Sequence, residues 1–147
     1  MSDAETAPHH NLFIDSHHPD SDRFAVFEDD GTSAWLYLTE SGSQKIAADV
    51  WIYNRFDAPP TSEIKSYPGN PPPAAIGYAS DTALCEAPQA HNWQIIWSHD
   101  GQSVALAKDG VPVGCIILAS RKNYSRELLK DGPWGKPWSD QVFESHF

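Results

Sequence analysis

Hydrophobic and polar residues alternate along the first half of the chain in a way that predicts β-strands. FAVFED at 24–29 and SAWLYLTE at 33–40 stand on either side of Asp30-Gly31. Alternation with a period of two places successive side chains on opposite faces of a strand. Asp-Gly between two such runs is a strong hairpin signal, because glycine accepts a positive φ without steric cost. A third strand is predicted at 50–53, where VWIY is dense in β-forming residues.

The same arrangement returns about seventy residues later. WQIIWS at 93–98, SVALAK at 103–108 and VPVGCIILA at 111–119 are typical of strands, and an Asp-Gly pair stands in each gap between them. Each half therefore follows the order strand, turn, strand, turn, strand. This order predicts two β-meanders that are packed together or joined into one sheet or sandwich. A duplication and an independent use of one favourable turn both explain the similarity.

Other segments lie outside this pattern. Residues 1–22 are polar, acidic and rich in histidine, and they predict a flexible leader. Residues from about 56 to 90 are rich in proline and predict a long excursion between the two meanders. KNYSRELLK at 122–130 is compatible with one or two helical turns. DQVFESHF at 140–147, with Ser139 in the N-cap position, predicts a short C-terminal helix.

The fold expected from these patterns is α+β and predominantly antiparallel β. It has about six strands in two β-meanders, a Pro-rich excursion at about 56–90 and a short C-terminal helix. A chain of 147 residues fits one domain. Residues 23–147 are therefore expected to form a single β-rich domain behind the leader at 1–22.

Composition and charge narrow the possible partners. The formal net charge is −10 at pH 7, whereas proteins that bind nucleic acids or anionic membranes present clustered Lys and Arg. A nucleic acid or an anionic membrane is therefore not expected as a partner. Basic residues do gather within 121–136, and they form either a solvated face or a docking site for an anion or a protein. The sequence shows no signal-peptide pattern and no apolar run near the ~20 residues of a membrane helix. A cytoplasmic protein with free Cys85 and Cys115 is predicted. A homo-oligomer is possible but is not indicated by the sequence.

The acidic group Glu28, Asp29 and Asp30 stands where the first hairpin reverses. The corresponding residues of the second hairpin are Ser98-His99-Asp100, which keep the Asp-Gly turn and lack the two preceding carboxylates. The shared aspartate therefore indicates turn chemistry. The two additional carboxylates leave a protein-contact patch open as an alternative. A calcium loop would need further oxygen ligands at regular spacings, and these are absent.

No catalytic, cofactor-binding or metal-binding residue is predicted. Neighbouring residues of a strand point to opposite sides, so Ser98, His99 and Asp100 cannot form a Ser-His-Asp relay. The sequence holds no phosphate-binding loop, nucleophile elbow or His-Glu-x-x-His motif. The His9-His10 and His17-His18 pairs would bind a metal only weakly, because nothing fixes their geometry.

Three tryptophans, Trp93, Trp134 and Trp138, are candidates for a ligand pocket. The last two lie in GPWGKPWS at 132–139, where each follows a proline. Aromatic side chains on such loops line ligand or peptide grooves, and they also pin loops onto a core. Both interpretations stay open from the sequence.

Four segments resemble a small bacterial family described as a domain of unknown function, family 2251. They are FAVFEDDGTSAWLYL at 24–38, VWIYNR at 50–55, WQIIWSHDGQSVALAKDGVPVGCIILASRKNY at 93–124 and WSDQVFESHF at 138–147. The resemblance leaves out the leader and most of the 56–90 segment. It implies a bacterial cytosolic protein and brings no activity, cofactor or catalytic residue with it.

These observations predict a non-enzymatic protein whose partner is another protein. One version is an immunity- or inhibitor-like protein, whose acidic face around Glu28, Asp29 and Asp30 meets a basic partner. The alternative is a small-molecule-binding protein or an enzyme, with a pocket between the sheet and the loop from Trp134 to Trp138.

Overall fold

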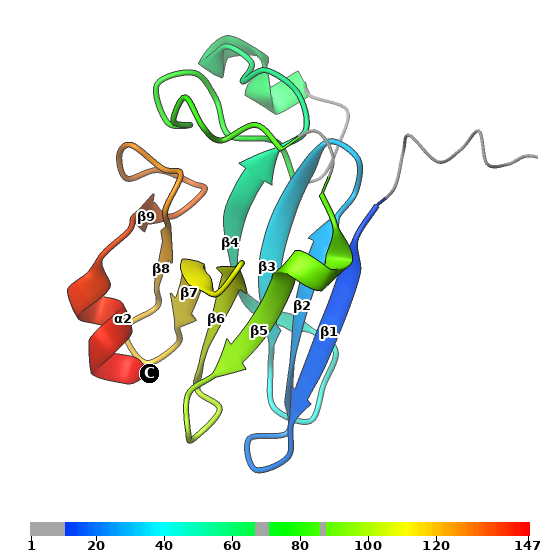
Figure 1. Ribbon diagram of the computed structural model, residues 1–147, viewed down its shortest axis with the longest axis vertical. Coiled ribbons are helices and arrows are strands. Elements are labelled where there is room, and N and C mark those ends of the chain that lie inside the picture. Colours follow the sequence, from blue (N-terminus) through cyan, green and yellow to red (C-terminus); the bar gives the residue numbers. More distant parts are fainter. Residues whose placement is uncertain (1–10, 67–70, 86–87) are drawn as a thin grey trace, which may run out of the picture.

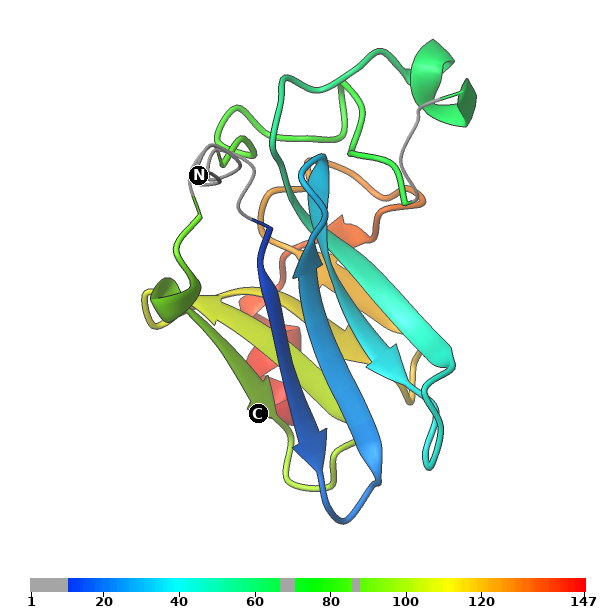
Figure 2. The same cartoon turned by 90° about the vertical axis from the view of Figure 1, so that its right-hand side faces the viewer.

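Two β-sheets lie face to face in separate layers (Figures 1 and 2). The structure is a computed structural model that describes residues 11–66, 71–85 and 88–147. Each sheet has an apolar inner face, and these two faces meet in the middle. The described residues form a β-sandwich with one short α-helix on its side.

The first sheet is formed by the N-terminal strands in chain order, and all of its neighbours are antiparallel. It contains β1 (Phe13–His18), β2 (Arg23–Asp29), β3 (Ser33–Thr39) and β4 (Ile46–Asn54). The turn between β2 and β3 contains Gly31, whose φ of 93° suits glycine. The predicted Asp-Gly hairpin is therefore confirmed.

The second sheet is formed by the C-terminal strands, again in chain order. It contains β5 (Trp93–Trp97), β6 (Ser103–Lys108), β7 (Val111–Ile117), β8 (Lys122–Ser125) and β9 (Lys136–Pro137). The first three pairs are antiparallel, and β9 lies parallel to β8. The helix α2 (Asp140–His146) follows, and the Ser139 hydroxyl accepts a hydrogen bond from the backbone N–H of Val142 at its N-terminus.

The mostly antiparallel β architecture and the short C-terminal helix are confirmed, whereas the number of strands is not. The described residues form nine strands instead of about six. One additional strand, β8, occupies part of the stretch at 122–130 that is compatible with helical turns, and that prediction is wrong. Its backbone pairs with β7, because tertiary pairing outweighs the weak helical preference of four residues.

The prediction of a flexible leader at 1–22 is wrong from Phe13 onwards, because this stretch forms β1. Residues 1–10 lie outside the described residues. Along β1 the exposed and half-buried positions alternate, and every residue from Phe13 to His18 pairs with β2. The side chain of Leu12, just before the strand, is buried in the core between the sheets. This alternation is the signal that a strand begins here.

The main core lies between the two sheets. Phe27, Leu36 and Val50 come from the first sheet, and they meet Leu106 and Ile116 from the second sheet; all five are fully buried. Polar contacts also join the layers at the edge where β1 and β5 lie. The indole Nε1 of Trp97 donates a hydrogen bond of 2.8 Å to the hydroxyl oxygen of Ser16. These contacts fix how the two sheets stack.

A second core covers part of the opposite side of the first sheet. Trp35 and Trp51 point away from the sandwich interior and pack against Ala74, Ala75 and Trp134. Asn54 holds the covering segment, because its side chain exchanges two hydrogen bonds of 3.0 Å with the backbone of Ala74. The described part of the expected excursion at 56–90 also includes the 3-10 helix Thr61–Ser66, while 67–70 and 86–87 lie outside the described residues.

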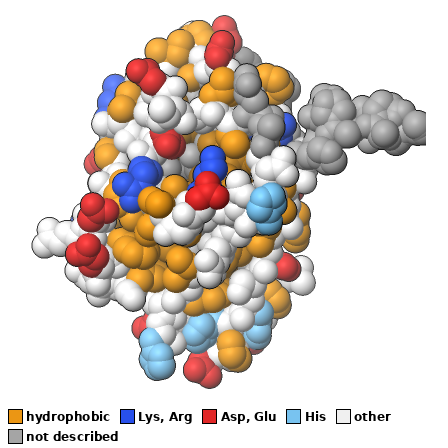
Figure 3. All heavy atoms as spheres, viewed as in Figure 1, with side chains coloured by type: hydrophobic (Ala, Val, Ile, Leu, Met, Phe, Trp, Pro, Cys, Tyr) orange, Lys and Arg blue, Asp and Glu red, His pale blue; other side chains and the backbone are white. Residues whose placement is uncertain are grey.

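A third core lies between α2 and the outer side of the second sheet. Cys115 and Ile117 are buried there under Trp138, Val142 and Phe143. Figure 3 looks onto this side of the molecule, where hydrophobic side chains gather in the middle and histidine side chains lie near the lower end. None of the described helices is long and apolar enough to cross a membrane.

Candidate functional site

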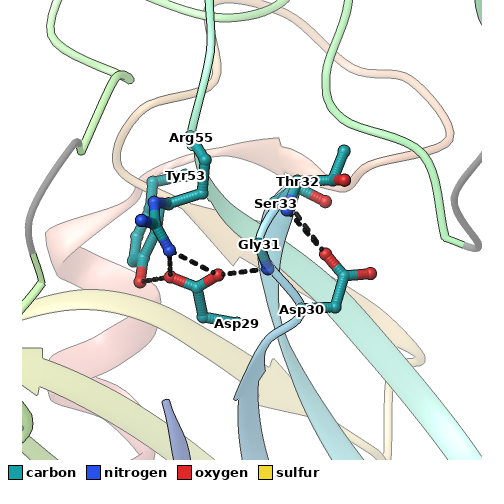
Figure 4. A network of polar contacts seen from close by, with 7 residues as sticks. All are labelled: Asp29, Asp30, Gly31, Thr32, Ser33, Tyr53 and Arg55. Atoms are coloured by element: carbon teal, nitrogen blue, oxygen red, sulfur yellow. Dashed lines mark hydrogen bonds and ion pairs between the residues drawn. The ribbon is translucent and has the colours of Figure 1, made fainter. Parts of the chain in front are cut away.

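The acidic group at the β2–β3 turn consists of three carboxylates in three different environments. Asp29 is fully buried, whereas Glu28 and Asp30 are exposed. The carboxylate of Asp29 accepts hydrogen bonds from Tyr53 Oη at 2.5 Å and from Arg55 Nη1 at 3.0 and 3.1 Å (Figure 4). Asp29 is therefore not part of an exposed acidic surface, and its prediction as a protein-contact residue is wrong.

Asp29 also organises the turn that follows it. One carboxylate oxygen accepts a hydrogen bond of 2.8 Å from the backbone N–H of Gly31 (Figure 4). Burial, followed by the hydrogen bond to Asp29 and by its charge, raises the pKa of Tyr53, so the tyrosine keeps its proton and acts as the donor. This buried network joins the end of β2 to the end of β4. Its contacts therefore hold the fold together and are not exposed to a partner.

Asp30 has the turn chemistry that the comparison of the two hairpins predicts. Its carboxylate accepts hydrogen bonds from the backbone N–H groups of Thr32 at 2.9 Å and Ser33 at 3.2 Å. Asp100 of the second hairpin accepts in the same way from Gln102, at 3.0 Å. This bond is the first cause of the lowered pKa of Asp100. The aspartate shared by the two hairpins is an Asx-turn residue in both.

The outer face of β1 and β2 carries an exposed apolar surface beside the acidic turn. Phe13, Phe24, Val26 and Ile46 line a hollow of about 230 Å³ there, and Asp15 lies at its margin. The side chain of Phe13 is 64% exposed and that of Ile46 is 44% exposed. Phe13 pairs with Glu28 across the two strands, so these side chains share one face of the sheet. This set of residues is called the outer-face patch below.

Negative charge lies along part of the margin of the outer-face patch. Asp15, Glu28 and Asp30 are all exposed. Tyr37 of β3 lies opposite Val26 on the same face, and its pKa is raised by burial and then by the charges of Glu28, Asp49 and Asp30. Glu28, Asp49 and Asp30 therefore lie close enough to act on Tyr37, and they place negative charge on this side of the molecule. An apolar surface with an acidic margin is the result.

Trp93, Trp134 and Trp138 do not meet, so a pocket lined by all three does not exist. Trp93 packs between the two sheets against Phe27, with ring centroids 4.8 Å apart. Trp134 lies in the second core, and Trp138 packs under α2. The two tryptophans of the proline-rich loop thus pack into two separate cores. Of the two interpretations left open by the sequence, the structure supports the one in which these aromatic side chains attach the loop to the core.

A polar hollow nevertheless lies where the loop from 131 to 136 passes β4. It measures about 220 Å³, and Asp49, Arg121, Lys122, Asn123 and Lys136 contribute to its lining. No histidine or cysteine is among the described residues that line it. The tryptophan side chains point elsewhere, so this hollow differs in character from the aromatic pocket expected from the sequence.

The residues of the outer-face patch and of the polar hollow are not among the predicted site residues. Phe13 belongs to the stretch assigned to the leader, although FIDSHH alternates with a period of two. Asp49 directly precedes the apolar run VWIY. An acidic residue at this position indicates that one face of β4 carries a charge. The pairing of Tyr53 and Arg55 with Asp29 has no local signal, because 24 and 26 residues separate them along the chain.

The described residues contain no group of His, Cys, Asp and Glu side chains that could hold a metal ion. His9 and His10 lie outside the described residues. His17 contacts Asp22 at 2.8 Å, and His18 accepts a hydrogen bond from the backbone N–H of Ser21. Both histidines of the second predicted pair thus make contacts within the β1–β2 turn, and His18 Nε2 also lies 3.0 Å from the backbone oxygen of His99 in the β5–β6 turn.

Neither cysteine belongs to a disulfide, and the two differ in accessibility. Cys115 is fully buried, and burial raises its pKa to about 12, whereas Cys85 is half-buried. Iodoacetamide at pH 8 is expected to alkylate Cys85 at least about tenfold faster than Cys115, because only a thiolate reacts. Peptide mass spectrometry after timed labelling measures both rates, with Cys85→Ser as the control. Equal rates at the two positions would contradict the burial of Cys115.

Comparison with family models, with curated proteins and with solved structures finds no match for the chain. The resemblance to family 2251 therefore stays a prediction. The function has to be inferred from the geometry alone.

Proposed function

We propose that the chain is a non-enzymatic protein-binding protein that docks a basic partner protein on the outer-face patch. The observation that carries this proposal is the exposure of Phe13 and Ile46 in one apolar hollow of about 230 Å³. Exposed apolar patches with a polar margin are typical of protein-interaction sites, because covering them releases water from apolar surface. The cytoplasmic location predicted from the sequence remains part of this proposal.

The acidic margin supports a basic partner. Asp15, Glu28 and Asp30 are exposed around the patch, and the chain carries a formal net charge of −10. A second copy of this chain would bring the same negative charges to the same margin, so self-association there would be opposed. A partner with Lys or Arg around an apolar side chain would be attracted and correctly oriented. An immunity- or inhibitor-like protein that captures a basic target fits this description.

Peptides selected from a random dodecapeptide library displayed on phage test the proposal. Panning on the wild-type protein is expected to recover basic sequences that contain a bulky apolar residue. The double variant Phe13→Ser, Ile46→Ser is expected to bind them at least about tenfold more weakly, since two apolar anchors are lost. Leu129→Ser is the matched control, because it removes another apolar side chain that is 59% exposed.

Two results would contradict the proposal. Peptides that bind the double variant as tightly as the wild type would exclude the outer-face patch as the docking surface. Recovered sequences without an excess of Lys and Arg would exclude the basic partner. A basic peptide should also bind more weakly as the salt concentration rises, because the charges around the patch are exposed.

The alternative prediction, a small-molecule-binding protein, is supported by one observation. The polar hollow between β4 and the loop from 131 to 136 has a volume of about 220 Å³. This volume is below the ~300 Å³ at which pockets for drug-sized ligands begin, so only a small ligand would fit.

A further inference from the structure

The polar hollow beside β4 contains hydrogen-bond acceptors that have no donor. Within the described part of the chain, no hydrogen bond reaches the carboxylate of Asp49. The side-chain oxygen of Asn123 is buried and likewise lacks a partner among the described residues. The amide nitrogen of Asn123 donates a hydrogen bond of 2.7 Å to the backbone oxygen of Asp49, and this bond decides which end of the amide is the oxygen. The buried side-chain oxygen of Asn123 and the half-buried carboxylate of Asp49 thus share one hollow, and neither accepts a hydrogen bond from a described residue.

No described residue forms an ion pair with the carboxylate of Asp49. Burial raises the pKa of this carboxylate. The titratable and charged groups around it are Tyr37 on β3, Arg121 in the β7–β8 turn, Lys122 at the start of β8, and the pair formed by Asp131 and Lys136. An ionised carboxylate in a half-buried site without a partner costs free energy. A donor that carries a positive charge would remove that cost.

Two of the three cations in the same hollow are available to a ligand. Lys136 forms an ion pair with Asp131, with 2.6 Å between the ammonium nitrogen and a carboxylate oxygen. Arg121 and Lys122, in contrast, form no ion pair with any described residue. The hollow therefore combines unsatisfied acceptors with unpaired cations, and these do not neutralise one another.

We propose that this hollow binds a small zwitterion with a primary ammonium group and an anionic group. The ammonium donates hydrogen bonds to the carboxylate of Asp49 and to the side-chain oxygen of Asn123. The anionic group, a carboxylate or a phosphate, is held by Arg121 and Lys122. The volume of about 220 Å³ suits a molecule of the size of an amino acid. This site is separate from the outer-face patch and does not depend on the proposed function.

Titration followed by two-dimensional ¹⁵N NMR tests the site, with γ-aminobutyrate and O-phosphoethanolamine as zwitterionic probes. At least one probe is expected to produce saturable shifts at the side-chain amide of Asn123 and at the backbone of 121–123 and 131–136. Ethanolamine and inorganic phosphate, which each carry only one of the two charges, are expected to bind at least about tenfold more weakly. The two zwitterions distinguish a carboxylate from a phosphate as the anionic group.

Asp49→Asn provides a second readout that does not depend on ligand. Because the pKa of Asp49 is raised in the folded state, its ionised form destabilises the fold, and the variant is expected to melt at a higher temperature than the wild type. The same variant should bind the zwitterion at least about tenfold more weakly. Asp30→Asn, which lies in the β2–β3 turn, is the matched control and should leave binding unchanged.

Three results would overturn the proposal. One is that neither zwitterion causes a saturable shift at concentrations up to about 10 mM, well above the millimolar dissociation constants of weak ligands. Another is that ethanolamine or phosphate alone binds as tightly as the zwitterions. The third is that Asp49→Asn binds the probe with unchanged affinity.

Discussion

Replacing Asp29 by asparagine is expected to lower the free energy of unfolding by about 3–5 kcal/mol, because the variant breaks the buried ion pair between Asp29 and Arg55. The side chains of Asp29 and Arg55 are 0% and 7% exposed, respectively. Water cannot replace the lost partner at such a site. A change of this size is a large part of the 5–15 kcal/mol that stabilises a typical domain. Urea denaturation followed by tryptophan fluorescence measures it.

Asp30→Asn is the matched control for this prediction. Asparagine can still accept the hydrogen bonds of the turn, and Asp30 is exposed, so the variant should stay within about 0.5 kcal/mol of the wild type. The double variant Asp29→Leu, Arg55→Met should lose less than the sum of the two single variants, because it removes both buried charges together. Equal losses for Asp29→Asn and Asp30→Asn would show that Asp29 has no special structural role.

Replacing Asn54 by alanine is expected to lower the free energy of unfolding by about 3 kcal/mol or more. The side chain of Asn54 is 1% exposed, and its oxygen accepts hydrogen bonds from Trp51 Nε1 at 2.8 Å and from the backbone N–H of Ala74 at 3.0 Å. Its amide nitrogen donates to the backbone oxygen of Ala74 at 3.0 Å. The alanine variant leaves three buried groups without partners, at a cost of about 1–3 kcal/mol for each.

The same variant should loosen the segment that covers the first sheet. Hydrogen exchange at 71–85 is expected to become faster in Asn54→Ala, while exchange in β6 changes little, because Asn54 connects this segment to β4. Gln94→Ala, at an exposed position of β5, is the control and should change neither property. Unchanged exchange at 71–85 would mean that the apolar contacts of the second core hold the segment without Asn54.

The strands of the two hairpins could be predicted from the sequence because their signals are local. Period-two alternation and the Asp-Gly turns identify β2, β3, β6 and β7 without any knowledge of their neighbours. β1 was missed because its two histidines and its aspartate suggested a polar leader, although every second side chain faces the sheet interior. β8 and β9 are short, and they become strands only by pairing with β7 and with each other.

The roles of the acidic residues could not be predicted from the sequence for a different reason. Glu28, Asp29 and Asp30 are chemically similar neighbours, yet alternation along β2 exposes Glu28 and buries Asp29. The burial of Asp29 is tolerated only because Tyr53 and Arg55 arrive from β4, and that pairing depends on tertiary structure. The hairpin comparison identified Asp30 correctly, because an Asx turn needs only the backbone of the next residues.

The central claim is that function resides on the outer-face patch and not in the buried network of Asp29. Hydrogen–deuterium exchange of the protein, with and without a basic peptide selected from the phage library, tests it most directly. The account predicts slower exchange in Phe13–His18 of β1 and in Arg23–Asp29 of β2, with no change in α2. Protection confined to α2 or to the β5–β6 turn, with β1 and β2 unchanged, would contradict the account.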